Sequence, residues 1–152
     1  MLYFLPRMLG DSQTVEKNPV CTRDAPERTA GMPTVFVISK DWSLRVAVRA
    51  ELLHAGVEAL GMESVDDLAQ ALAQGRAPSA VVLDVAGEGA ALSAAAPRAA
   101  LASLARGVPI VVVASRVEPA PPLEGAAAVL YRPVRVGEIV ARVRQLLEGQ
   151  AA

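Results

Sequence analysis

The stretch SAVVLDVAGEG, residues 79–89, contains the clearest sign of the fold. Its first half is apolar and rich in valine up to Asp84, a pattern that predicts a short strand buried on both faces. Two glycines follow within five residues, which is typical of a loop leading from a strand into a helix. Strands of this kind occur in parallel sheets, where chemistry lies beyond the carboxyl ends of the strands. Asp84 is therefore a reactive group, a metal ligand or a turn residue, depending on the neighbouring strand ends.

On either side of this stretch, short apolar runs alternate with segments of helical periodicity. Leu44, Val48 and Leu52 are spaced four residues apart, as on one face of a helix, and Ser64 opens a capping box. Pro97 must break or restart the helix in which it lies. The predicted strands are 34–39, 57–62, 79–84, 108–115 and 127–132, and the predicted helices are 41–56, 64–74, 90–106 and 136–149. This alternation predicts an α/β fold, a doubly wound parallel sheet of the (βα)5 type.

Composition and charge argue against several classes of protein. The 152 residues are 53% hydrophobic and only 3% aromatic, and the formal net charge is −1. Nucleic-acid-binding domains are normally basic or carry aromatic platforms, so we expect no nucleic-acid partner. Cys21 is the only cysteine, which excludes an intramolecular disulfide and a multi-cysteine metal site. No apolar run reaches the roughly 18 residues that a membrane span requires, so we expect a cytoplasmic protein without membrane contact.

The chain divides into three parts. Residues 1–31 are predicted to be a disordered N-terminal tail, because most of them are polar, with prolines and no periodicity. Alternatively, Met32 is the natural start and the preceding residues result from a wrongly assigned start site. Residues 32–149 form the predicted domain, and residues 150–152 form a short tail.

The order of the elements and three motifs resemble the receiver domain of two-component response regulators. The motifs are VVLDV around Asp84, AAAVLYRPV with Arg132 and Pro133, and EIVARVRQLLEG in the last helix. The resemblance covers residues 33–149 and implies a flavodoxin-like fold with strand order 2-1-3-4-5. It also implies that Asp84 stands where the family's aspartate accepts a phosphoryl group from a histidine kinase. In that family two acids after the first strand hold Mg²⁺, while a Thr or Ser after the fourth strand and a Lys after the fifth contact the phosphoryl group.

The chain departs from that family where Mg²⁺ would bind. Ser39 and Lys40 stand in place of the acid pair, and the nearest acid, Asp41, begins the predicted first helix. One carboxylate beside a lysine is a poor site for Mg²⁺, which prefers oxygen ligands in near-octahedral geometry. We therefore expect no metal cofactor. We also expect Asp84 to be a structural anion between Lys40 and Arg132 instead of a phosphoacceptor.

The positions after the fourth and fifth strands differ from the family as well. Ala114 falls where a hydroxyl is expected, and Ser115 follows it on what should be the opposite face. Arg132, before Pro133, keeps the charge of the family's lysine, but a planar guanidinium is not equivalent to a compact ammonium. Three prolines within 116–124 forbid a regular helix. The fourth helix should therefore be shortened or lost, and with it part of the surface through which many receivers dimerise.

The sequence thus predicts a stand-alone receiver-like signalling domain with a degenerate phosphorylation site. It would act as a phosphorylation-independent protein-interaction module and not as an enzyme. Its partner would be a protein, such as a histidine kinase or an output protein, and an oligomer is compatible with the sequence. In a first alternative, the chain is a phosphoryl-accepting response regulator with Asp84 as acceptor and Asp41 as a ligand of Mg²⁺. In a second, it is a flavodoxin-like domain that binds a small ligand, although DVAGEGA lacks a phosphate-binding glycine motif.

Overall fold

A computed structural model describes residues 32–117 and 123–151 of the chain. The strands are β2 (Thr34–Ile38), β3 (Glu58–Met62), β4 (Ala80–Asp84), β5 (Ile110–Ala114) and β6 (Ala128–Tyr131). The helices are α3 (Trp42–His54), α4 (Val65–Ala73), α5 (Gly89–Ser93), α6 (Ala95–Ala105) and α7 (Val136–Ala151). All neighbouring strands pair in parallel, in the order β3-β2-β4-β5-β6. Counted along the chain, this order is 2-1-3-4-5, which confirms the predicted fold class.

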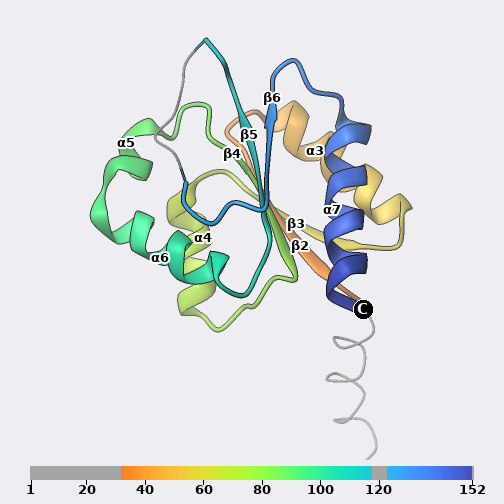
Figure 1. Cartoon of the computed structure of the whole chain (residues 1–152), viewed down its shortest axis with the longest axis horizontal. Coiled ribbons are helices and arrows are strands. Elements are labelled where there is room, and N and C mark those ends of the chain that lie inside the picture. Colours follow the sequence, from red (N-terminus) through yellow and green to blue (C-terminus); the bar gives the residue numbers. More distant parts are fainter. Residues whose placement is uncertain (1–31, 118–122, 152) are drawn as a thin grey trace, which may run out of the picture. The chain divides into compact units, whose positions relative to one another are not determined.

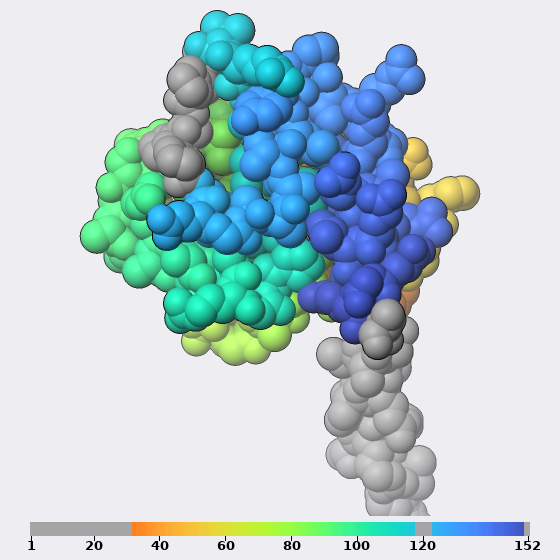
Figure 2. All heavy atoms as spheres, viewed as in Figure 1, coloured from red at the N-terminus to blue at the C-terminus, as the bar shows by residue number. Residues whose placement is uncertain are grey.

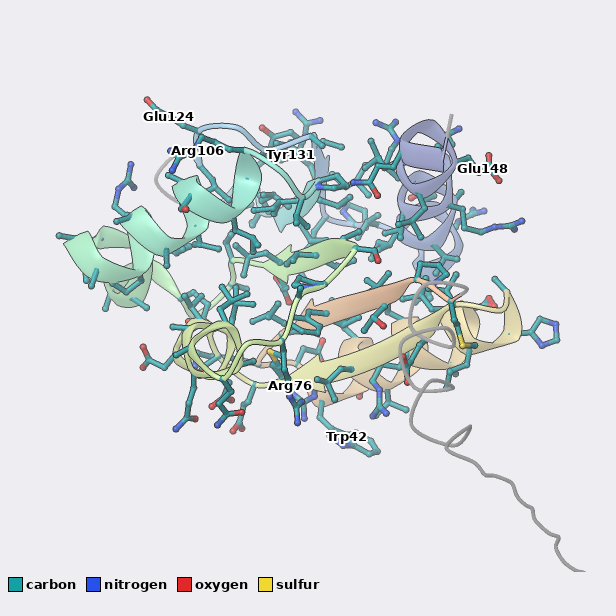
Figure 3. All side chains as sticks on the ribbon, turned by 90° about the horizontal axis from the view of Figure 1, so that it is seen from below. Trp42, Arg76, Arg106, Glu124, Tyr131 and Glu148 are labelled. Atoms are coloured by element: carbon teal, nitrogen blue, oxygen red, sulfur yellow. The ribbon has the colours of Figure 1, made fainter. Side chains whose placement is uncertain are left out.

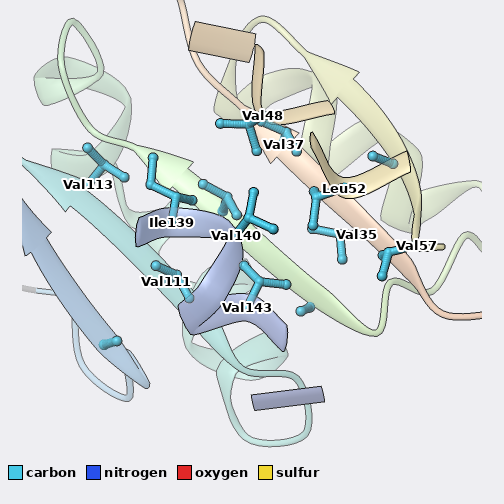
Figure 4. Close-up of a cluster of buried hydrophobic side chains, with 14 residues drawn as sticks. Val35, Val37, Val48, Leu52, Val57, Val111, Val113, Ile139, Val140 and Val143 are labelled. Carbon is cyan, nitrogen blue, oxygen red and sulfur yellow. The ribbon is translucent and has the colours of Figure 1, made fainter. Parts of the chain in front are cut away.

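The helices cover the two faces of this sheet, with α3 and α7 on one face and α4, α5 and α6 on the other (Figure 1). This arrangement follows from the alternation of side chains along each strand. On β4, Val82 belongs to the apolar cluster beneath α3 and α7, whereas Val81 and Leu83 belong to the cluster beneath α4, α5 and α6. Figure 4 shows the first cluster, in which Ile139 and Val143 of α7 face the strands. Both faces of the central strands are therefore buried, as the unbroken apolar runs predict.

The helix predicted for residues 90–106 is interrupted where the sequence requires it. The first part, α5, ends at Ser93, and α6 begins at Ala95 after the extended residue Ala94. Pro97 then lies in the first turn of α6, where its missing N–H would have no acceptor within the helix. The last helix, α7, continues through Gly149 to Ala151 and so extends past its predicted end. A glycine weakens a helix by about 1 kcal/mol but does not by itself end it.

The connection between β5 and β6 is described only in part. Residues 116–117 and 123–127 contain no helix, and the rest of the proline segment, residues 118–122, lies outside the described residues. On the edge strand β6, Val129 and Tyr131 pair with Val112 and Ala114 of β5 and are each 44% exposed. Figure 2 shows β6 and α7 side by side at the molecular surface. Among the described helices, none is long and apolar enough to span a membrane.

Candidate functional site

Parallel pairing brings the polar residues that follow β2, β4 and β6 to the same edge of the sheet. Asp84 is the last residue of β4, Ser39 directly follows β2, and Arg132 directly follows β6. These residues are separated by at least 45 positions along the chain, so only the sheet register joins them. The register that aligns Ile38 with Leu83 and Asp84 with Val113 fixes their relative heights.

The Asp84 carboxylate is buried and accepts hydrogen bonds from three donors. Its side chain is 1% exposed. The Ser39 hydroxyl donates to Oδ2 at 2.7 Å, and Arg132 Nη2 donates to the same oxygen at 2.6 Å. The backbone N–H of Ala86 donates to Oδ1 at 3.2 Å. Short hydrogen bonds between ionised partners are among the strongest that side chains make, and we call Asp84, Ser39 and Arg132 the Asp84 latch.

The two donor side chains of the latch are themselves fixed by the ends of the strands. The backbone N–H of Ser39 donates to Met62 O at 3.0 Å, and its hydroxyl oxygen accepts the N–H of Asp41 at 3.0 Å. A hydroxyl has one proton, so that proton is committed to Asp84. The backbone N–H of Arg132 donates to Ala114 O at 2.8 Å. The latch therefore joins residues at the carboxyl ends of all five strands of the sheet.

Lys40 does not complete the latch, contrary to the expectation that it pairs with Asp84. Its ammonium Nζ lies 3.9 Å from Oε2 of Glu88, in the loop after β4. The alkyl stem of Lys40 crosses Gly87 so closely that a Cβ there would be 2.9 Å from Lys40 Cδ. Gly87 has φ +77°, a conformation that favours glycine. The oxygen Oδ2 of Asp84 thus has Ser39 and Arg132 as donors, while Lys40 pairs with Glu88.

Glu88 is a second buried carboxylate at this edge, with a side chain 2% exposed. Burial raises the pKa of Glu88, and the Lys40 ammonium and the backbone N–H of Val65 oppose that shift, while Asp66 and Asp84 add to it. Its Oε2 has no hydrogen-bond partner among the described atoms. Its ion pair with Lys40 links the loop after β4 to the loop after β2.

The remaining predicted site residues have structural positions around the latch. Asp41 is the N-cap of α3, and its Oδ1 accepts the backbone N–H of Ser43 at 3.0 Å. Ala114 ends β5 and supplies the carbonyl that Arg132 uses, while the Ser115 hydroxyl accepts the N–H of Val117 at 3.1 Å. Pro133 follows Arg132 through a cis peptide bond and is exposed.

The residues at this edge do not fit a Mg²⁺ site of the receiver type. Asp41 is used as a helix cap, the Asp84 carboxylate is bound by Ser39 and Arg132, and the ammonium of Lys40 lies beside Glu88. Within residues 32–117 and 123–151, no three His, Cys, Asp or Glu side chains are grouped so that they could hold a metal ion.

Sequence reasoning missed Glu88. In the stretch AGEGA it has no apolar pattern around it, and a charged residue between glycines normally lies in a solvated turn. The available signal was Lys40, a cation next to a buried strand end, since Asp84 already had Arg132 as a candidate partner. The only other carboxylate in the loop after β4 is Glu88.

No protein-family model matches the chain, and no curated protein matches it in sequence. Solved structures do match its fold. A response regulator receiver protein from Burkholderia phymatum is 24% identical, with a TM-score of 0.61 over 76% of this chain and 95% of that chain. An orphan response regulator of H. pylori is 20% identical, with a TM-score of 0.58 over 77% of this chain and 98% of that chain.

A CheY-like receiver domain protein from Methanospirillum hungatei is 18% identical to the chain, with a TM-score of 0.58. That match covers 76% of this chain and 94% of that chain. The similarities therefore extend over nearly the whole of each receiver domain and over the sheet and helices described above. This chain has the fold of response regulator receiver domains.

Proposed function

We propose that the chain is a receiver-like signalling domain that binds a protein partner without being phosphorylated at Asp84. The observation that supports this proposal is the Asp84 latch. A carboxylate that attacks phosphorus needs a free oxygen lone pair and room for the incoming phosphoryl group in line with it. Ser39 and Arg132 use both lone pairs of Oδ2, the N–H of Ala86 uses one lone pair of Oδ1, and burial of the side chain limits access to the lone pair that is left.

The electrostatics of the site support the same proposal. Phosphoryl transfer requires cations that neutralise charge on the transferring oxygens, and metal ions usually supply that charge. Here the two cations of the site are already paired, Arg132 with Asp84 and Lys40 with Glu88. Phosphorylation of Asp84 would have to break its contact with Arg132. The negative charge of the added phosphoryl group would then have no divalent ion beside it. The domain is proposed to act through its surface, with no enzymatic activity of its own.

Phosphoryl-donor labelling tests this function. The purified protein is incubated with acetyl phosphate and Mg²⁺, and its intact mass is measured beside a receiver domain that has the family's acid pair. We expect labelling of that reference domain and none of this chain. A phosphoryl group on the wild-type chain that is absent from the Asp84→Asn variant would overturn the proposal in favour of a phosphoryl-accepting regulator.

A gain-of-site variant sharpens this experiment. The double change of Ser39→Asp and Lys40→Asp introduces two acids where receivers hold Mg²⁺, and it removes one donor from Asp84. Labelling of this variant by acetyl phosphate, with an unlabelled wild type, would show that these two residues account for the lack of phosphorylation.

Titration with Mg²⁺ gives a second test that does not depend on a phosphoryl donor. Trp42 is the only tryptophan and directly follows Asp41, so its fluorescence reports on the loop between β2 and α3. We expect no saturable change in emission at millimolar Mg²⁺, because the positions of the acid pair hold a hydroxyl and an ammonium. A saturable change that disappears in Asp84→Asn would contradict the proposal.

A further inference from the structure

One edge of the sheet has backbone groups without a neighbouring strand. Among the described strands, β3 is outermost and pairs only with β2. The N–H of Glu58 and the carbonyl of Met62 bond to residues that flank β2, and successive residues of a strand direct these groups to opposite sides. Ala59 and Gly61 therefore direct their N–H and C=O groups away from the sheet. Such an edge is a template for another strand.

The side chains along this edge are small or apolar. Ala59 and Gly61 lie on the face of the sheet toward α3, and the partly buried Leu60 lies on the face toward α4. A hollow of about 390 Å³ beside Leu60 and Gly61 is lined on the α4 side by Gln70 and Gln74, among others. Edge strands are commonly protected by proline, lysine or a bulge. β3 has an unbroken register with β2 and neither proline nor lysine, so its edge is accessible to a further strand.

Opposite charges lie at the two ends of this edge. The helix α4 leads from the end of β3 back to the start of the next strand, so Arg76, which follows α4, lies toward the end of the edge where β3 begins. Figure 3 shows Arg76 beside the outermost strand. Glu63 and Asp67 lie where β3 ends, and all three side chains are exposed and line the hollow. The edge therefore has a cation at one end and two carboxylates at the other.

Two further charged residues near the edge are held toward β2. Glu58 Oε1 accepts the Thr34 hydroxyl at 2.9 Å, which draws this carboxylate away from the end where β3 begins. Arg45 Nη1 donates to Ser39 O at 2.6 Å. Arg45 also lines the hollow beside the two carboxylates, but one cation leaves that end of the edge net negative. The opposite charges of the two ends are thus preserved.

We propose that the chain forms a two-fold symmetric dimer in which β3 pairs with β3 of a second copy, so that two sheets become one. With the axis at Leu60, Ala59 of one copy lies opposite Gly61 of the other. Both residues direct their backbone groups outward, and such an antiparallel pair exchanges two N–H···O bonds. Symmetry repeats this exchange on the other side of the axis, where the two Leu60 side chains meet. The inference goes beyond the proposed function and does not depend on the chemistry of Asp84.

The charges along the edge support a second copy as the partner. In a two-fold pair residue i meets residue j while j meets i, so the start of one edge lies beside the end of the other. Arg76 of each copy would therefore lie toward Glu63 and Asp67 of the other copy. An edge with opposite charges at its two ends is complementary to itself, and complementary charge selects partners.

Arg49 opposes this dimer and limits its affinity. Its Nε donates to the outward carbonyl of Ala59 at 3.4 Å, and a Cβ at Gly61 would be 2.9 Å from Arg49 Cδ. The guanidinium group therefore lies near the proposed axis and its own copy, and like charges across an interface oppose binding. We expect a weak dimer, as for other small transient interfaces. Unfolding measurements at micromolar concentration then report on the monomer, because association follows mass action.

Sedimentation equilibrium from micromolar to millimolar concentration measures this association. Arg76→Glu and Glu63→Arg each place like charges at both ends of the pair, and each should weaken association at least about tenfold. Arg106→Glu is the matched control, at an exposed arginine that caps the end of α6, and it should change nothing. Circular dichroism establishes that all three variants are folded.

A mixture of the two interface variants gives the sharpest test. When Arg76→Glu and Glu63→Arg are combined in equal amounts, the introduced glutamate faces the introduced arginine at one end. The native Glu63 faces the native Arg76 at the other end. Association should therefore return in the mixture although each variant alone has lost it, because an antiparallel pairing brings opposite ends of the same edge together.

Two measurements near the axis complete the test. Arg49→Gln should strengthen association by about threefold, because it removes a like charge at an exposed pair. Amide exchange at Ala59 and Gly61 should slow as the protein concentration rises, whereas exchange at Leu60, whose N–H is directed toward β2, should change much less.

A chain that stays monomeric at millimolar concentration would overturn the proposal. So would a dimer that is unaffected by Arg76→Glu and Glu63→Arg, or one that Tyr131→Ser on β6 abolishes, because the opposite edge of the sheet would then be the interface. Association is measured without a phosphoryl donor, so a failure of the dimer and a failure of the proposed function are distinguishable.

Discussion

The Asp84 latch concentrates three hydrogen-bond donors on one buried carboxylate. The oxygen Oδ2 accepts from Ser39 and Arg132, and Oδ1 accepts from the N–H of Ala86. A buried donor that loses its acceptor incurs the full cost of its desolvation, and a cation that loses its partner incurs more. At the scale of single residues, the site is thus built so that the charge of Asp84 stabilises its surroundings.

The first residue-scale prediction concerns removal of that charge. Asp84→Ala should lower the free energy of unfolding by about 1–3 kcal/mol, the range for a buried polar group left without its partner. Urea denaturation of the wild type and the variant, in buffer with EDTA, measures the difference. Glu63→Ala, at an exposed carboxylate, is the control and should be close to neutral. A more stable Asp84→Ala would mean that the carboxylate repels other acids, as in a receiver with an intact acid pair.

The second residue-scale prediction concerns the pH dependence that Glu88 introduces. Since burial raises the pKa of Glu88, the folded protein favours the protonated carboxyl group more than the unfolded chain does. Its contribution to stability is therefore fully present below about pH 4.3, the ordinary value for Glu, and is lost as the pH rises through the folded pKa. Glu88→Gln removes this titration.

The stability of Glu88→Gln relative to the wild type should therefore increase between acidic and neutral pH. Urea denaturation at a series of pH values measures this, with Glu63→Gln as the exposed control. A difference between Glu88→Gln and wild type that is constant with pH would mean that Lys40 and the N–H of Val65 compensate the buried charge completely.

At the scale of elements, helix capping explains the position of Asp41, a carboxylate that could otherwise be taken for a metal ligand. Asp41 accepts the N–H groups of Ser43 and Leu44 at the start of α3, and Ser64 accepts the N–H of Asp67 at the start of α4. Unpaired N–H groups in the first turn of a helix are satisfied best by Asp, Asn, Ser or Thr at the N-cap. Asp41 thus has a complete structural explanation within its own helix.

Substitution of Asp41 separates capping from metal binding. Asp41→Asn should leave the free energy of unfolding within a few tenths of a kcal/mol, because Asn caps as well as Asp, whereas Asp41→Ala should lower it by about 1 kcal/mol. Thermal or urea denaturation with and without Mg²⁺ measures both. If Asp41→Asn lost a stabilisation by Mg²⁺ that the wild type has, Asp41 would be a metal ligand, and the alternative of a phosphoryl-accepting regulator would gain support.

At the scale of the whole molecule, burial is uneven across the sheet. Every residue of β4 and β5 is buried, whereas Val129 and Tyr131 of the edge strand β6 are each 44% exposed. Edge strands and segments with few buried contacts open locally at a lower free energy than the core. Residues 116–117 and 123–127, which belong to the connection between β5 and β6, contain no helix.

Native-state hydrogen exchange should reflect that difference. The amides of β4 and β5 that pair within the sheet are expected to exchange only through global unfolding, while those of β6 and of residues 116–117 and 123–127 exchange through local opening. Protection factors, compared with the free energy of unfolding from urea denaturation, give the measurement. Protection of β6 equal to that of β4 would show that this edge is covered in solution, and the proposed loss of the fourth helix would need revision.

The sequence by itself determined most of the elements and the parallel class of the sheet, and its resemblance to receiver domains implied the strand order. The valine runs that end at Asp84 and Ala114 specify strands buried on both faces, and Pro97 specifies the break between α5 and α6, because each of these effects acts over a few residues. The strand-end residues Ser39, Asp84 and Arg132 could also be assigned to one edge, because parallel strands share the edge at which they end.

Only the tertiary structure decided how the charges at that edge pair. Lys40 and Arg132 are equally good partners for Asp84 in the sequence, but the Ser39 hydroxyl and Arg132 fill Oδ2, and the stem of Lys40 crosses Gly87 to reach Glu88. The burial of Glu88 and its ion pair with Lys40 bring together the loops after β4 and β2, which no local pattern encodes. Which charges pair depends on the relative positions of segments that lie far apart in the chain. Those positions are set only when the sheet and helices pack.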